Sequence, residues 1–190
     1  IAPDHLNHVI YANSGSEAND TVIRLVRHYW SLRGQPRKRV IIGREYGYHG
    51  STIMAASMGG MKAMHDQAAK EADFEHIRPP YSFLYQGNQS EAQFAESSAR
   101  LLKEKIQEIG VDKVAAFVAE PVQGAGGVII PPEGYFEHIQ KICVEFGILF
   151  IADEVITGFG RTGNWFASQT MSLEPDLVTL AKGLTSGYMP

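Results

Sequence analysis

Two acidic residues end an apolar run in the stretch LFIADEVITGFGRTG, which spans Leu149 to Gly163. Asp153 and Glu154 come directly after the run, and three glycines then follow in the spacing G-x-G-x-x-G. That spacing is typical of a dinucleotide-binding loop, in which the pyrophosphate meets the N-terminus of the next helix. No sustained helical pattern follows Gly163, and Pro175 comes soon afterwards. We therefore interpret the glycines as a tight loop rather than an NAD site.

A second stretch, SGSEAND, could bind an anion. Ser14 is followed three residues later by Glu17, the spacing of a capping box at a helix start. The backbone N–H groups of Gly15 and Ser16 would then lie at the helix N-terminus, with serine hydroxyls beside them. A phosphate group fits such a site, but an ordinary capped helix has the same pattern, so the pattern alone leaves both interpretations open.

An acid and a lysine each end an apolar run. Asp153 ends one run, where an unpaired carboxylate would be costly, so it needs a cationic or proton-donating partner. Lys182 ends another, in VTLAKG, where partial burial would favour the neutral amine and make it a usable nucleophile. The two residues could also simply pair with each other, and the residues alone leave this open.

One cofactor needs an acid, a lysine and a phosphate site together. Pyridoxal phosphate takes a lysine as Schiff base, an acid on its pyridinium nitrogen and a cradle for its phosphate. An aromatic residue over the ring is also expected, and the stretch GYHGST supplies Tyr48. His49 beside it is either a further polar contact or a structural histidine. The residues therefore predict pyridoxal phosphate as the cofactor.

Strands and helices alternate along the chain. The predicted order is a helix capped by Ser14, a strand at Val40–Ile42, an irregular segment at 58–90, a helix at 91–109, a strand in KVAAFVAE, a helix at 135–146 and strands in ILFIADEV and DLVTLAKG. This order predicts an α/β fold with a central, mostly parallel sheet flanked by helices. Ligands bind beyond the carboxyl ends of such strands, where Glu120, Asp153 and Lys182 would lie.

Composition and charge exclude several function classes. The chain has 190 residues, 44% of them hydrophobic and 20% charged, with a net charge of −4 and no block of lysine or arginine. We therefore expect neither nucleic acid nor a membrane as a partner, and we predict no metal site. Cys143, the single cysteine, lies among apolar residues, which predicts a buried thiol and a reducing compartment. With no signal peptide or membrane-length run, the sequence favours a cytoplasmic protein.

Five ordered motifs carry a family resemblance. The stretches NSGSEAND, GYHGST, AEPVQGAGGVIIPPEGY, IADEVITGFGRTG and PDLVTLAKGLTSGYMP resemble the class III (omega) pyridoxal-phosphate aminotransferases, most of all the omega-amino-acid:pyruvate branch. The resemblance implies the large cofactor-binding domain of fold type I, with residues 1–190 as part of that domain. It also implies a piece of a longer homodimeric enzyme, in which the N-terminal segment and the small C-terminal domain are missing from this chain and the piece alone is inactive.

The resemblance also implies roles for single residues. Ser14, Gly15 and Ser16 would surround the phosphate, Tyr48 would stack on the cofactor ring, and Val155 would pack on its opposite face. Asp153 would bind the pyridinium nitrogen, with Glu120 and His49 near the cofactor. Lys182 would form the internal aldimine and then move a proton between the substrate carbon and the cofactor.

The implied reaction moves an amino group from an omega-amino acid or amine to a 2-oxo acid. Members that use 2-oxoglutarate commonly carry a second glutamate five residues after the glutamate of the EP motif, where this chain has Ala125, so we expect pyruvate. The position of Ile156 is a glutamine in many relatives, and isoleucine cannot make the glutamine's bond to the ring oxygen. An aminomutase, racemase or decarboxylase would use the same residues, and an inactive cofactor-binding fragment is a further alternative.

Overall fold

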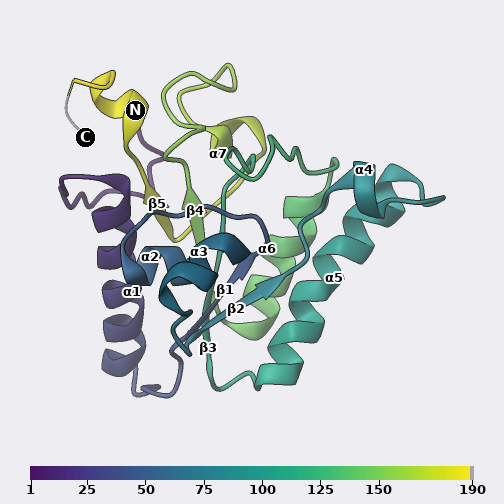
Figure 1. Ribbon diagram of the computed structural model, residues 1–190, viewed down its shortest axis with the longest axis horizontal. Helices are drawn as coiled ribbons and strands as arrows, with labels where there is room; N and C mark the ends of the chain where they lie inside the picture. The colour runs from purple at the N-terminus through teal and green to yellow at the C-terminus, as the bar shows by residue number, and fades with distance from the viewer. Residues whose placement is uncertain (189–190) are drawn as a thin grey trace.

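A five-stranded parallel sheet forms the centre of the protein in a computed structural model that describes residues 1–188. The strand order is β2-β1-β3-β4-β5, and every neighbouring pair is parallel (Figure 1). The strands are β1 (Val40–Arg44), β2 (Phe74–Ile77), β3 (Val114–Ala119), β4 (Leu149–Asp153) and β5 (Leu177–Thr179). The predicted α/β fold is confirmed.

Helices cover both faces of the sheet. They are α1 (Gly15–Leu32), α2 (Ile53–Met58), α3 (Lys62–Ala68), α4 (Ser82–Tyr85), α5 (Glu91–Ile109), α6 (Tyr135–Phe146), α7 (Ala167–Thr170) and the 3₁₀ turn η1 (Lys182–Thr185). The long helix α1 packs with α2 on one face, and α5 packs with α6 on the other (Figure 1).

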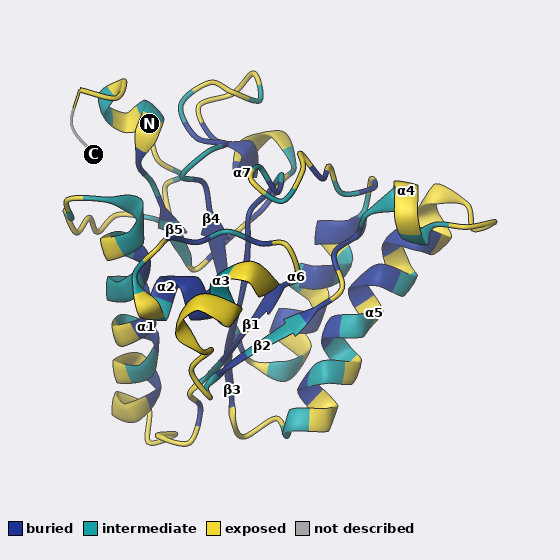
Figure 2. Cartoon of the chain, viewed as in Figure 1, coloured by how far each residue is buried: buried dark blue, intermediate teal, exposed yellow. Residues whose placement is uncertain are grey.

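The central strand β3 explains the layering. All six of its residues are buried, and the dark interior of Figure 2 follows the strands. Phe117 and Ala119 face the core shared with α5 and α6, whereas Ala116 and Val118 face the core shared with α1. A parallel strand covered on both faces reads as a continuous apolar run, as this one does.

The helix ends follow their sequence signals closely. Ser14 caps α1, and its Oγ accepts the Glu17 N–H at 3.2 Å. The Glu17 carboxylate bonds the Asn13 N–H at 2.6 Å, one residue before the position that a capping box predicts. At α5, Ser90 and Gln93 form a complete capping box, and Gly110 ends the helix as predicted.

The segment at 58–90 is the main error of the sequence prediction. It was expected to be irregular, yet it contains α3, the edge strand β2 and α4. The sequence of β2 is Phe-Glu-His-Ile, and only its two end residues are buried. So short a segment with polar residues at its centre has no clear period, and its pairing with β1 makes it a strand.

Two smaller expectations can be compared with the structure. Cys143 is buried in α6, as predicted, and burial raises the pKa of its thiol. Among residues 1–188, no helix is both long and apolar enough to cross a lipid bilayer.

The two sides of α6 should respond differently to truncation. Ile139 is fully buried against the sheet, so Ile139→Ala should lower the free energy of unfolding by about 2–5 kcal/mol. Val144 in the same helix is 83% exposed, and Val144→Ala should change it by less than about 0.5 kcal/mol. Denaturant unfolding of both variants measures the difference, and equal losses would contradict this packing.

Candidate active site

A pocket of about 350 Å³ opens at the carboxyl ends of the strands. All the residues that the sequence analysis assigned to the cofactor or to catalysis line it: Ser14, Gly15, Ser16, Tyr48, His49, Glu120, Asp153, Val155 and Lys182. Gly50, Ile156, Ala181 and Gly187 complete the lining. The sheet thus brings together residues that lie up to 168 positions apart between Ser14 and Lys182, as the strand-end rule predicts.

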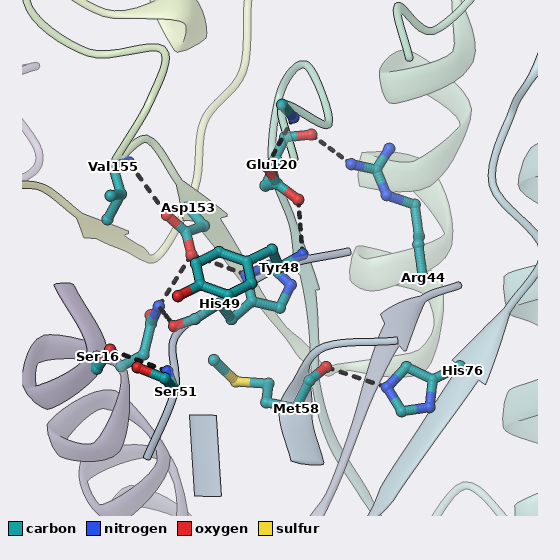
Figure 3. A network of polar contacts seen from close by, with 12 residues as sticks. Ser16, Arg44, Tyr48, His49, Ser51, Met58, His76, Glu120, Asp153 and Val155 are labelled. Carbon is teal, nitrogen blue, oxygen red and sulfur yellow. Dashed lines mark hydrogen bonds and ion pairs between the residues drawn. The ribbon is translucent and has the colours of Figure 1, made fainter. Parts of the chain in front are cut away.

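Asp153 is the buried acid of this pocket. It ends β4 and is 3% exposed. Its Oδ2 accepts hydrogen bonds from Asn19 Nδ2 at 2.9 Å and from His49 Nδ1 at 2.7 Å, and its Oδ1 accepts the Val155 N–H at 3.1 Å (Figure 3). Within residues 1–188 its one ion-pair partner is His49. The alternative in which Asp153 pairs with Lys182 is therefore wrong.

Asn19 is a member of this network that the sequence reasoning missed. It is fully buried in α1, and its Nδ2 also donates to the His49 carbonyl at 2.6 Å. A signal was present: Asn19 precedes Ile23 by four residues and Val26 by seven, so it lies on the apolar stripe of the helix. A polar residue on a buried stripe needs a buried partner.

A neutral histidine lies behind this network. His76 donates Nε2–H to the Met58 carbonyl at 3.1 Å (Figure 3). Burial, more than any other cause, lowers the pKa of His76 to about 4, so its ring is uncharged near pH 7. It therefore adds no positive charge to the surroundings of Asp153.

The N-terminus of α1 forms another side of the pocket. Gly15 packs against Val155, and a Cβ on Gly15 would lie 3.1 Å from Val155 Cγ2. Ser16 Oγ accepts the Ser51 N–H at 3.1 Å, which holds the segment after β1 against the helix start. These contacts place the free N–H groups of the first helical turn beside the pocket.

Glu120 connects the loops after β1 and β3. Its Oε1 accepts the Tyr48 N–H at 3.0 Å and its Oε2 accepts the Gly124 N–H at 2.9 Å (Figure 3). The buried Arg44 donates from Nη2 to the Glu120 carbonyl. The acid is 3% exposed, and both of its oxygens are satisfied by backbone groups, so it fixes the backbone of Tyr48.

Lys182 lies at the mouth of the pocket. It begins η1, three residues after the end of β5, and its side chain is exposed. The expected partial burial is therefore wrong for this chain, because β5 ends at Thr179 and Ala181 takes the buried position. Lys182 has φ 42°, a left-handed conformation that residues other than glycine seldom adopt.

Glu154 has a different task from Asp153. It is fully buried, and its carboxylate accepts the N–H groups of Ala167 at 2.6 Å and Ser168 at 2.8 Å and the hydroxyl of Thr157 at 3.0 Å. The glycine loop is thus tied to the start of α7. No helix begins at Gly163, which confirms that these glycines form a loop.

No cluster of histidine, cysteine, aspartate or glutamate within residues 1–188 is arranged to hold a metal ion.

Comparison with known proteins identifies the family. The sequence pattern described as Aminotransferase class-III matches residues 1–190, so the chain belongs to the class-III aminotransferases. It is 55% identical over 195 residues to the putrescine–pyruvate aminotransferase of Pseudomonas aeruginosa, covering 100% of this chain and 42% of that protein. It is 43% identical to the diaminobutyrate–2-oxoglutarate transaminase of Halomonas elongata, covering 100% of this chain and 41% of that protein.

Solved structures agree with this assignment. The omega-transaminase of Pseudomonas jessenii, in complex with PMP, superposes with a TM-score of 0.92 at 45% identity, covering 94% of this chain and 40% of that one. The (S)-enantioselective omega-transaminase of Thermomicrobium roseum gives 0.92 at 42% identity, with the same coverage of 94% and 40%. The chain thus spans about two fifths of the length of these relatives.

Gly50 should be the most sensitive glycine of the pocket. It has φ +137°, and an added Cβ would lie 2.6 Å from Ser16 Oγ and 2.8 Å from Ser16 Cα. Gly50→Ala should therefore cost about 1–3 kcal/mol of backbone strain and a steric clash in addition. Gly34→Ala is the control, because Gly34 has φ +72° and nothing within 4 Å of its added Cβ, so only strain opposes it. Thermal unfolding compares the two, and a smaller loss at Gly50 would contradict the close approach.

Proposed function

We propose that the intact protein is a pyridoxal-phosphate-dependent aminotransferase that moves an amino group from an omega-amino acid or amine to pyruvate. The observation that carries this proposal is the buried, ionisable Asp153 in a pocket shared with a helix N-terminus and Lys182. The names of the relatives support it, because they include a putrescine–pyruvate aminotransferase and an omega-transaminase in complex with PMP.

The residues present fit pyridoxal phosphate. Asp153 receives hydrogen bonds from Asn19 Nδ2, His49 Nδ1 and the Val155 N–H and none from a lysine or arginine within residues 1–188, so no lysine or arginine competes with a cationic ring nitrogen. The backbone N–H groups at the start of α1 suit a phosphate. Tyr48 and Val155 line the same pocket and would cover the two ring faces. When bound, the cofactor supplies the electron sink for a carbanion at the substrate carbon.

Each residue would then have its own role. Gly15 and Ser16 would bind the phosphate through their N–H groups, and Glu120 keeps Tyr48 in place through its backbone. Asp153 would hold the proton on the ring nitrogen, with His49 beside it. Lys182 Nζ would hold the cofactor covalently and, as a free amine, would carry a proton to and from the substrate carbon.

Three wider assignments belong to the same proposal. Residues 1–190 form part of the large cofactor-binding domain of a longer enzyme. The intact enzyme is a homodimer, which is supported by large apolar side chains left open to contact, such as Tyr11 and Phe83 at 88% and 85% exposure. The single buried thiol fits a cytoplasmic enzyme.

Lys182→Ala tests the covalent role of the lysine. In the intact protein, the variant should leave no borohydride-stable adduct, and turnover should fall by about a thousandfold or more, a loss of about 4 kcal/mol at 1.4 kcal/mol per tenfold. The exposed Lys62 pairs with Asp66 on α3, and Lys62→Ala is the control that should keep both properties. An adduct retained in Lys182→Ala would show that another residue binds the cofactor.

The acceptor is tested by steady-state kinetics of the intact enzyme. Ala125 is exposed in the loop after Glu120 and carries no carboxylate to neutralise a substrate-binding arginine. Because a permanently unpaired arginine in a closed pocket would be costly, we expect a less charged acceptor pocket and a kcat/KM for pyruvate at least about tenfold above that for 2-oxoglutarate. A preference for 2-oxoglutarate would contradict this.

A donor screen that gave racemisation or CO₂ release in place of amino transfer would favour the other class III reactions.

A further inference from the structure

Asn19 joins three separate parts of the site. It lies in α1, whose N-terminus borders the pocket, and its one amide nitrogen bonds both the Asp153 carboxylate at 2.9 Å and the His49 carbonyl at 2.6 Å. The three residues come from the helix, the end of β4 and the loop after β1. Figure 3 shows Asp153 and His49 facing each other at the centre of this network.

The orientation of the Asn19 amide follows from its partners. A carbonyl and a carboxylate both accept hydrogen bonds, so the NH₂ group must face them. The amide oxygen, Oδ1, is then left buried without a hydrogen-bond partner among residues 1–188. An unsatisfied buried acceptor is unfavourable, and local conflicts of this kind concentrate at functional sites. The Asn19 oxygen therefore stays without a hydrogen bond, and both N–H groups of the amide point toward Asp153 and the His49 carbonyl.

The geometry points to Asn19 as a positioning residue that holds the Asp153 carboxylate in place, aimed at the ring nitrogen of the cofactor. Hydrogen bonds donated to a carboxylate favour its charged form. A lysine or arginine in this place would also donate a hydrogen bond but would neutralise the charge, and an apolar residue would remove one of the two side-chain donors to Asp153 Oδ2. A neutral amide is the donor that keeps the charge available. This inference rests on the proposed function.

The same amide ties the acid to the loop that carries Tyr48. His49 directly follows Tyr48 in the chain, and Asn19 bonds the His49 carbonyl. Glu120 accepts the N–H of Tyr48, at the preceding peptide group. The peptide groups on both sides of the Tyr48–His49 pair are thus fixed to buried side chains. Asn19 thereby links the position of the Tyr48 backbone to the position of the Asp153 carboxylate.

A double-mutant cycle on cofactor affinity tests this role in the intact protein. Asn19→Leu has a similar shape but no donor, and it should weaken pyridoxal phosphate binding by about tenfold, or about 1.4 kcal/mol. If Asn19 acts through Asp153, the same substitution in an Asp153→Asn background should change the dissociation constant by less than about threefold, because the two effects are then not additive. Additive effects would overturn the role and leave Asn19 a structural residue.

A second measurement does not depend on Asp153→Asn binding the cofactor. The absorbance of the bound cofactor, followed against pH, should show the ring nitrogen losing its proton at a lower pH in Asn19→Leu than in the wild type. An unmoved transition would overturn the inference. If Asn19→Leu does not fold, Asn19→Ser, which keeps one donor, should show a smaller shift in the same direction, and no shift would again overturn it.

Asp20→Asn is the matched control. Asp20 is the next residue of α1 and also holds the loop, because its Oδ1 accepts the Thr52 hydroxyl at 2.7 Å, yet it does not line the pocket. Asparagine keeps that acceptor, so cofactor affinity and the pH transition should both stay as in the wild type. A wild-type protein that bound no pyridoxal phosphate would overturn the proposed function itself. If the wild type binds the cofactor but the effects of Asn19→Leu and Asp153→Asn are additive, only the role of Asn19 is overturned.

Discussion

The burial of the Asp153 carboxylate is the constraint on which the site depends. A charged carboxylate at 3% exposure is unfavourable unless hydrogen-bond donors surround it. Those donors come from α1, from the loop after β1 and from the turn after β4 itself. They meet only because the parallel sheet brings the strand ends to one edge and α1 packs on the face above them. The order β1-β3-β4-β5 then places Glu120 on one side of the acid and Lys182 on the other.

Three buried acids at this edge differ in the way they are satisfied. Glu120 accepts backbone N–H groups from two loops, and Glu154 accepts them from the start of α7, so both acids act as braces for the chain. Asp153 has side chains as its main donors. Backbone donors fix the path of a loop, whereas side-chain donors hold a charge in place without closing the space in front of it. Asp153 therefore differs from the other two acids in how its charge is held.

Local signals were sufficient to predict much of this arrangement. The cap at Ser14, the apolar run of β3 and the acid at the end of β4 are all determined by residues close in sequence. The edge strand β2 was not predictable, because pairing with β1 and not its own pattern makes it a strand. Asn19 and Asp153 lie 134 residues apart, so a buried polar residue could be noticed in the helix but its partner could not be named.

The position of Lys182 follows from a different requirement than that of Asp153. A group that holds a fixed charge works best when its hydrogen bonds are complete and its rotamer is locked, as at Asp153. The role proposed for Lys182, to bind the cofactor and carry a proton, requires rotamer freedom, and within residues 1–188 the Nζ of Lys182 makes no hydrogen bond or ion pair. The apolar run before Lys182 predicted that the lysine would be buried. The buried part of the run ends at Ala181, one residue before the lysine. The left-handed backbone at Lys182 turns the chain out of that run, so the side chain of Lys182 is exposed while Asp153 stays buried.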